Sequence, residues 1–186
     1  DRTGCAKHAG FHQFPEVTLR LLPEICPVTQ YLAQSHRLQA IATIVQNPEI
    51  LDAARNARQR VEAQRLPKVS IAKAEKLFAT NKLVKPSQKL NDYLRNSAKT
   101  LSIPEIILTD SYGFNFAYNR ITSDFVQRDE SWWQQGKLKN IWISTPDYDR
   151  SAYTFGFNLV QAIKDPQTGE FLGIIKAVLP ISQIEL

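Results

Sequence analysis

The chain has 186 residues, of which 43% are hydrophobic and 22% are charged, so one globular domain with its own core is expected. No stretch approaches the roughly 18 uninterrupted apolar residues of a transmembrane helix, because Lys176 and Pro180 break the most apolar run. The net charge of +5 is uneven, since residues 1–102 hold 16 Lys and Arg against 8 Asp and Glu, whereas residues 103–186 hold 7 against 10.

Acidic residues stand among the basic residues of the first half, around segments with helical spacing. This mixture is typical of solvated helical faces, and contact with an anionic membrane or a nucleic acid is the alternative. We expect no nucleic-acid partner. The sequence contains no Met and does not begin with one, so we interpret it as a piece of a longer protein.

Residues 1–27 have no sustained period and are predicted to form an irregular N-terminal arm. Cys5 and Cys26 could form one disulfide in an oxidising compartment, or both could be reduced. His8 and His12 are four residues apart, a spacing that can present two imidazoles to a metal. Because supporting ligands are sparse, we interpret them as surface histidines.

Apolar residues recur at three and four positions from Val28 onward, which predicts a long kinked helix over residues 28–66. Asn47 and Pro48 supply a helix cap and a proline suited to the first helical turn, so the kink is placed there. Pro67 is expected to end the helix. Further helices are predicted within residues 70–102, one after Ser70 and one over residues 88–101.

Residues 103–186 contain five strand-like apolar segments. Residues 110–113 and 165–169 are tight-turn patterns and predict hairpins between segments 106–108 and 114–118 and between segments 152–163 and 171–181. A further strand is expected over residues 140–145. The connection before it is predicted to hold a short helix capped by Ser123 or Asp124 and closed by Gly136.

The predicted order is helices followed by hairpin-linked strands, which indicates an α+β fold: an antiparallel sheet of about five strands with a long N-terminal helix on one face. We find no glycine-rich phosphate loop, no nucleophile–base pair and no cluster with metal-ligand spacing. The sequence therefore predicts a binding module that is not an enzyme and needs no cofactor.

The chain resembles a Cache domain, the PAS-like extracytoplasmic sensor module of bacterial transmembrane receptors. The resemblance covers roughly residues 30–186 and depends on short motifs in family order. These motifs are Asn47-Pro48-Glu49, Thr109-Asp110 with Gly113, the group Asp124, Gln127, Asp129, Glu130, Trp132 and Trp133, the group Asp149, Ser151 and Ala152, and finally Asp165-Pro166, Thr168-Gly169-Glu170 and Leu172-Gly173-Ile174.

The resemblance implies one sensor domain over residues 28–186 in the periplasm, anchored by membrane spans outside this sequence. The output would be of chemoreceptor, histidine kinase or cyclase type. A homodimer through the long helix is a separate expectation, in which that helix serves as a partner surface. The oxidising compartment that the resemblance implies favours a Cys5–Cys26 disulfide. Family ligands are small anions and amino acids, and we expect a carboxylate, an amino acid or an amine.

Candidate ligand-binding residues lie on the sheet and on the connection that carries the tryptophan pair. They are Tyr118, Arg128, Trp132, Trp133, Tyr148 and Asp149. The aromatic side chains could form apolar walls with polar tips. Arg128 could hold a carboxylate through two parallel hydrogen bonds, and Asp149 could accept bonds from an amine or hydroxyl.

Each candidate also has a purely structural interpretation. One indole of the tryptophan pair is expected in the core, and Arg128 could pair only with its acidic neighbours. Amino-acid-binding relatives carry an Arg two residues before a Trp, whereas Glu130 occupies that position here. The alternative function is a structural or dimerisation module without a small ligand.

Overall fold

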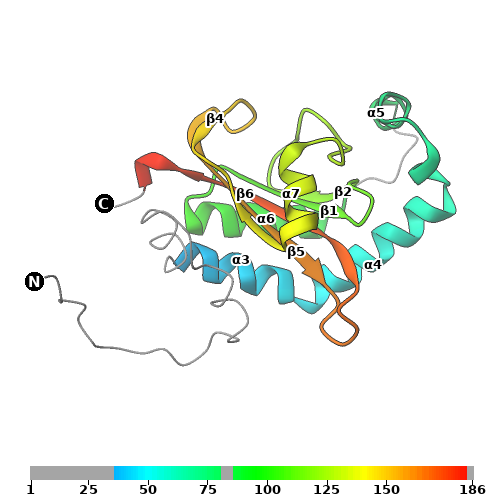
Figure 1. Cartoon of the computed structure of the whole chain (residues 1–186), viewed down its shortest axis with the longest axis horizontal. Helices are drawn as coiled ribbons and strands as arrows, with labels where there is room; N and C mark the ends of the chain where they lie inside the picture. Colours follow the sequence, from blue (N-terminus) through cyan, green and yellow to red (C-terminus); the bar gives the residue numbers. More distant parts are fainter. Residues whose placement is uncertain (1–35, 81–85, 184–186) are drawn as a thin grey trace, which may run out of the picture. The chain divides into compact units, whose positions relative to one another are not determined.

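The computed structural model describes residues 36–80 and 86–183. Two helices, α3 (His36–Gln46) and α4 (Pro48–Ala63), run end to end along the sheet (Figure 1). Asn47 separates them as predicted, and its side-chain oxygen accepts a 2.9 Å hydrogen bond from the Glu49 N–H. Residues 28–35 of the expected long helix lie outside the described residues, as do both cysteines and the His8–His12 pair.

Helix α4 ends at Ala63, earlier than the predicted stop at Pro67. Arg65 then takes a left-handed conformation with φ 57°, and a short 3-10 helix, η1 (Leu66–Lys68), includes the proline. Helix α5 (Ile71–Ala79) follows Ser70, whose side chain makes no capping hydrogen bond. Helix α6 (Gln88–Leu101) has the predicted bounds, and the side chain of its N-cap, Ser87, accepts a hydrogen bond from the Leu90 N–H.

Six strands form one open antiparallel sheet: β1 (Glu105–Asp110), β2 (Asn115–Tyr118), β3 (Ile141–Ile143), β4 (Asp147–Asp149), β5 (Thr154–Lys164) and β6 (Phe171–Pro180). Their order is β2-β1-β6-β5-β3, and β4 pairs with β5 beside this path. The α+β prediction and both hairpins are confirmed. The prediction of about five strands missed β4, because its residues are polar and read as a turn.

Helix α7 (Ser131–Lys139) carries both tryptophans and corrects two expectations about the connection. The helix is capped at Glu130, so Ser123 and Asp124 lie in the preceding loop. Gly136 lies inside the helix and does not close it; the helix ends instead at Lys139, and Asn140 is its C-cap with φ 64°. A Cβ on Gly136 would stand 2.4 Å from Cγ1 of Val160, so glycine here permits close packing on β5.

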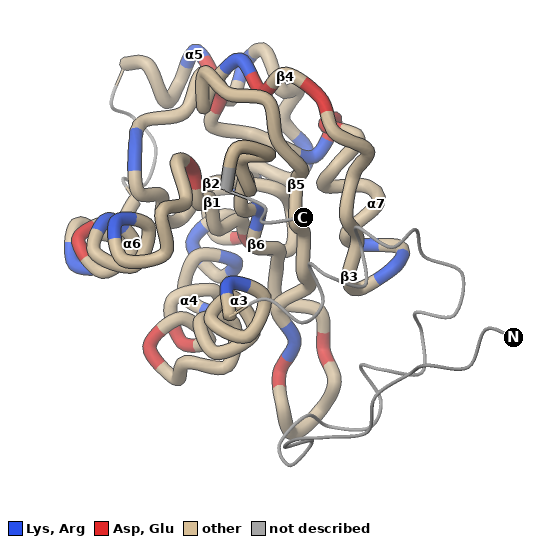
Figure 2. The backbone as a smooth tube through the Cα atoms, turned by 90° about the vertical axis from the view of Figure 1, so that its left-hand side faces the viewer, with Lys and Arg blue, Asp and Glu red and all other residues tan. Residues whose placement is uncertain are grey.

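The two faces of the sheet have different coverings. Helices α3 and α4 pack on one face, which confirms the prediction of a long helix there, and α6 contacts β1 and β2. Helix α7 contacts β3, β5 and β6, and in Figure 2 it lies on the other side of the sheet from α3 and α4. Because α7 is short, it covers only part of its face and leaves sheet residues beside it for a cavity.

Candidate ligand-binding site

A cavity of about 500 Å³ lies on the α7 side of the sheet. Its lining comes from three parts of the chain: the strands β1, β5 and β6, the connection of residues 119–140, and residues 147–151 around β4. The volume falls in the range of about 300–1,000 Å³ that small-molecule pockets occupy. The cavity is bounded by the connection that carries Trp132.

Strand register explains why the polar floor of the cavity lies on one face. Ile107 of β1 and Val160 of β5 are both paired with Lys176 of β6, and Val178 is paired with Glu105 and with Asn158. Directly paired residues project to the same face, and so do residues two apart on one strand. Glu105, Ile107, Asn158 and Lys176 therefore all line the cavity.

Lys176 is a buried cation held by two carboxylates. Its Nζ donates to Glu105 Oε1 at 2.9 Å and to Asp149 Oδ2 at 3.0 Å, and the side chains of Lys176 and Glu105 are 7% and 0% exposed. Burial alone would lower the pKa of Lys176, but the two carboxylates outweigh it and raise the pKa. Lys176 therefore stays charged at neutral pH.

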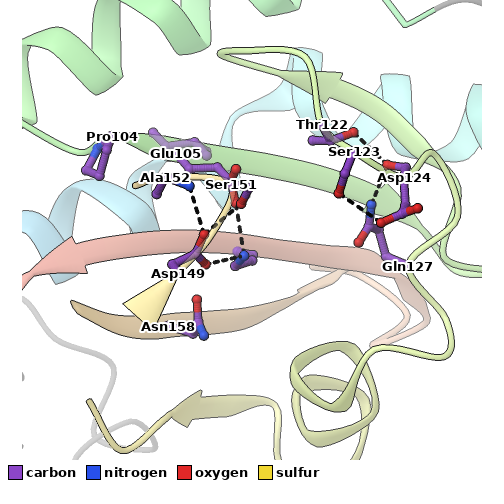
Figure 3. Close-up of polar contacts among 12 residues, drawn as sticks. Pro104, Glu105, Thr122, Ser123, Asp124, Gln127, Asp149, Ser151, Ala152 and Asn158 are labelled. Carbon is purple, nitrogen blue, oxygen red and sulfur yellow. Dashed lines mark hydrogen bonds and ion pairs between the residues drawn. The ribbon is translucent and has the colours of Figure 1, made fainter. Parts of the chain in front are cut away.

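Asp149 joins the β4 segment to the floor of the cavity. Besides Lys176, it accepts hydrogen bonds from the Ser151 hydroxyl at 2.7 Å and from the Ala152 N–H at 2.9 Å (Figure 3). Burial opposes ionisation of Asp149, but the charge of Lys176 and these hydrogen bonds outweigh it and lower the pKa. Asp149 is therefore an ionised acceptor fixed at the cavity.

A second polar group lies around Asp124 at the other end of the view in Figure 3. The backbone oxygen of Asp124 accepts hydrogen bonds from Gln127 Nε2 at 2.6 Å and from the Thr122 hydroxyl, also at 2.6 Å. The Ser123 hydroxyl donates to the Asp124 carboxylate at 2.8 Å. These bonds order the part of the connection that forms the second wall of the cavity.

The tryptophan pair divides between the cavity and the core. Trp132 lines the cavity, and Lys176 Nζ stands 5.6 Å from the centre of its ring. Trp133 packs with Val160 and Ile174, and its indole N–H donates to the Thr109 hydroxyl at 3.0 Å. We therefore assign cavity contact to Trp132 and a packing role to Trp133.

Arg128 is not among the residues that line the cavity. Its Nη2 donates to the Val69 carbonyl at 2.7 Å, and its guanidinium carbon lies 5.4 Å from the centre of the Phe114 ring. Gly113 explains this placement, because a Cβ there would stand 2.7 Å from the Arg128 backbone nitrogen and push the segment away. The geometry thus gives Arg128 a structural position behind the wall of the cavity.

The two predicted tyrosines also separate. Tyr148 lines the cavity, is 44% exposed and packs against Phe155 with ring centres 5.2 Å apart. Tyr118 is on the edge strand β2, away from the cavity lining, and its N–H donates to Asn91 at 2.9 Å. Of the six candidates, Trp132, Tyr148 and Asp149 are thus brought together at the cavity.

The sequence reasoning missed most of the polar floor. Lys176 was considered only as a break in an apolar run, Glu130 only as a motif residue standing where relatives carry an Arg, and Glu105 and Asn158 were not considered. A signal existed, because single opposite charges inside two apolar strands, IPEIIL and FLGIIKAVL, indicate a buried pair. Nothing local shows that these strands are neighbours, since Glu105 and Lys176 are 71 residues apart.

Within residues 36–80 and 86–183, no three His, Cys, Asp or Glu side chains are grouped to hold a metal ion. No helix of that part is long and apolar enough to cross a membrane. The polar lining of the cavity carries charged residues of both signs. Its acidic members are Glu105, Asp124, Glu130, Asp147 and Asp149, and its basic members are Arg150 and Lys176.

No family model and no curated protein matches the chain. Among solved structures, the isoleucine-bound sensory domain of a Campylobacter jejuni chemoreceptor matches with a TM-score of 0.42 and 16% identity over 84% of this chain and 64% of that one. The ligand-binding domain of the Pseudomonas fluorescens chemoreceptor CtaA in complex with L-serine matches with a TM-score of 0.42 and 18% identity, over 70% of this chain and 55% of that one. The sensor domain of the V. cholerae histidine kinase DctB matches with a TM-score of 0.41 and 15% identity, over 77% of this chain and 58% of that one.

The structure is an α+β domain with an antiparallel sheet and a polar cavity on one face of that sheet. The matched structures are sensory or ligand-binding domains of bacterial chemoreceptors and of a histidine kinase. The chain spans about 55–65% of the length of these matched chains.

Proposed function

We propose that the chain is the extracytoplasmic ligand-sensing domain of a bacterial transmembrane receptor and that it binds a small molecule in the cavity beside α7. It performs no catalysis. The observation that carries the proposal is a pair of buried acceptors among the lining residues. Glu105 Oε2 and Asn158 Oδ1 have no hydrogen-bond partner among the described residues.

Unsatisfied buried acceptors are rare because each costs about 1–3 kcal/mol. A ligand that donates hydrogen bonds to them would recover that cost, and the surrounding Trp132 and Tyr148 would cover its apolar part. Amino acids are named for the matched chemoreceptor domains. The ligand class of this chain depends on the charged residues that line its own cavity.

The signal would pass through the strand that forms the floor. Lys176 lies in β6, which pairs with both β1 and β5 and contacts α3 and α4 on the opposite face. A ligand that draws the connection and the β4 segment onto the sheet would compete for the bonds of Lys176. It would thereby shift β6 relative to the α3–α4 helices. Shifts of this kind require that the ligand bind one arrangement more tightly than the other.

A thermal-shift screen over carboxylates, amino acids and amines tests the binding proposal. A ligand at a hundred times its Kd stabilises by about 2.7 kcal/mol, or roughly 5–10 °C for a chain of this size. The shift should be lost in Trp132→Ala and Asp149→Ala and kept in Asp129→Asn, because Asp129 neighbours the cavity residue Glu130 without lining the cavity. No shift with any compound, together with concentration-dependent mass in sedimentation, would favour the structural or dimerisation module.

Amide exchange with and without a hit compound tests the signalling route. Protection should change in β6 and in α3 and α4 as well as at the cavity. Changes confined to residues 122–132 and 147–151 would contradict transmission through the strand.

A further inference from the structure

The lining of the cavity has an excess of carboxylates, and its buried cation, Lys176, is already paired with two of them. Five carboxylates and two cations line it, which gives a net charge of −3 when all are ionised. Glu105 and Asp149 both bond Lys176, so the three together carry one negative charge. The cavity therefore presents an excess of acceptors to whatever enters it.

The geometry also disfavours a carboxylate ligand. Lys176 is committed to two carboxylates at 2.9 and 3.0 Å, so a third could reach it only by displacing one of them. The other cation of the lining, Arg150, is exposed beside β4, where solvent weakens its attraction for an anion. An anion would also meet the carboxylates of Asp124, Glu130 and Asp147.

Several atoms of the lining can receive a cation. Glu105 Oε2 and Asn158 Oδ1 are buried without a hydrogen-bond partner in the described part of the chain, and both can only accept. Glu105 itself is 0% exposed. The carboxylates also repel one another. The pKa of Glu130 is raised first by burial and then by the negative charges of Asp129, Asp124 and Asp149, although Lys176 lowers it. A positive group between them would relieve this repulsion.

Resting on the proposed ligand-binding function, we propose that the cavity selects a small aliphatic amine without a carboxylate, with one ammonium group at Glu105 and Asn158. A second ammonium group would be favoured by Asp124 and Glu130 on the opposite wall. Trp132 supplies an aromatic wall for such a cation, as its contact with the Lys176 ammonium already shows. A metal ion would need converging ligands, and no such group occurs in residues 36–80 and 86–183.

A four-carbon series isolates the end-group charge in a calorimetric titration at pH 7.5. The compounds are 1,4-diaminobutane, 1-aminobutane, 4-aminobutanoate and succinate, which share their length and differ only in their ends. The expected affinity falls in that order, and the diamine should exceed succinate by at least about a hundredfold, since each charged hydrogen bond is worth about tenfold or more.

Substitutions in the wall of the cavity test which carboxylates bind the amine, and they spare the buried residues of the sheet. Glu130→Gln and Asp124→Asn should each weaken diamine binding by about tenfold while leaving 1-aminobutane less affected. Asp129→Asn is the matched control, because it removes the same charge next to Glu130 without changing the lining, and it should have a smaller effect. Glu105→Gln should weaken every amine, and its melting curve shows separately whether the fold persists.

The outcomes separate this inference from the proposed function. Tighter binding of succinate or 4-aminobutanoate than of the diamine would overturn the amine assignment and leave a small-ligand sensor in place. Failure of all four compounds, with a hit from another chemical class in the wider screen, would have the same meaning. Failure of every compound in both experiments would overturn both proposals.

Discussion

The indole N–H of Trp133 donates a 3.0 Å hydrogen bond to the hydroxyl of Thr109, and both residues are buried. The bond ties α7 to β1, and Trp133 also packs against the Phe171 ring of β6. Because α7 also carries Trp132, next to Trp133, the position of the cavity wall depends on this anchor. Thr109→Val should therefore destabilise the fold by about 1–3 kcal/mol, since the buried N–H loses its acceptor.

A double-mutant cycle in urea checks that expectation. Trp133→Phe removes the donor, so adding Thr109→Val to it should cost less than Thr109→Val alone. Equal costs in both backgrounds would show that the hydrogen bond contributes nothing to stability.

Gly136 provides a second prediction, because α7 can approach β5 only without a side chain there. A Cβ would lie 2.4 Å from Val160 Cγ1 and 3.2 Å from Ile174 Cδ1. Gly136→Ala should destabilise by about 1–3 kcal/mol, although alanine favours helix by about 1 kcal/mol. Val160→Ala in the same chain should restore part of the loss. Lys139→Ala, on the exposed side of α7, is the control and should be close to neutral in chemical denaturation.

The raised pKa of Asp110 leads us to expect a free energy of unfolding that depends on pH. Burial raises its pKa from 3.8 to about 6, although the N–H groups of Phe114, Tyr112 and Gly113 oppose the shift. Between these values the folded state keeps a proton that the unfolded chain has lost. The contribution of Asp110 is therefore most favourable below about pH 4 and falls by about 3 kcal/mol as the pH rises past 6.

Asp110→Asn isolates that effect, because asparagine cannot ionise but can still accept from Tyr112 and Phe114 through its side-chain oxygen. The variant should gain stability relative to the parent chain as the pH rises from 4 to 7. Denaturation curves at pH 4, 5, 6 and 7 measure the difference. A difference that does not change with pH would contradict the raised pKa.

Two ion pairs fasten the β5–β6 turn to α4 and give a prediction about local opening. Arg55 bonds Asp165, and Arg58 bonds Glu170. The Arg55 hydrogen bond, with the N–H groups of Thr168 and Gln167, lowers the pKa of Asp165 to about 2. Arg55→Gln should therefore speed amide exchange at residues 165–170 at pH 7. Lys89→Gln, which breaks the exposed bond to Glu49 between α4 and α6, should leave that turn unchanged.

Local rules were enough for most elements of the fold. Asn47 and Pro48 fix where α4 begins. The Asp110–Gly113 turn forms because the Asp110 side chain accepts hydrogen bonds from the N–H groups of Tyr112 and Phe114, and because Gly113 takes φ 83°. Gly136 was misread, because a glycine that permits packing looks in sequence like one that ends a helix. The difference lies in Val160, a residue of another element.

The site was harder to predict because its floor is made by register. Trp132, Tyr148 and Asp149 were accessible to sequence reasoning, since aromatic and acidic residues on connections are typical of binding sites. Lys176 and Glu105 meet only because β1 and β6 pair, and Asn158 joins them because β5 pairs with β6 on the other side. Arg128 was assigned to a ligand from its residue type and its place on the connection that carries the tryptophan pair, whereas in the fold it donates to the Val69 carbonyl and lies near the Phe114 ring.

The central place of β6 has a consequence for how the protein forms during synthesis. Residues 171–180 form the last of the six described strands to be synthesised, yet in the sheet they stand between β1 and β5. Until that strand emerges, the β1–β2 hairpin and β5 have open edges, which invite pairing with other chains. A released polypeptide truncated at residue 170 should therefore depend on chaperones, whereas one that includes residues 171–180 should resist proteases.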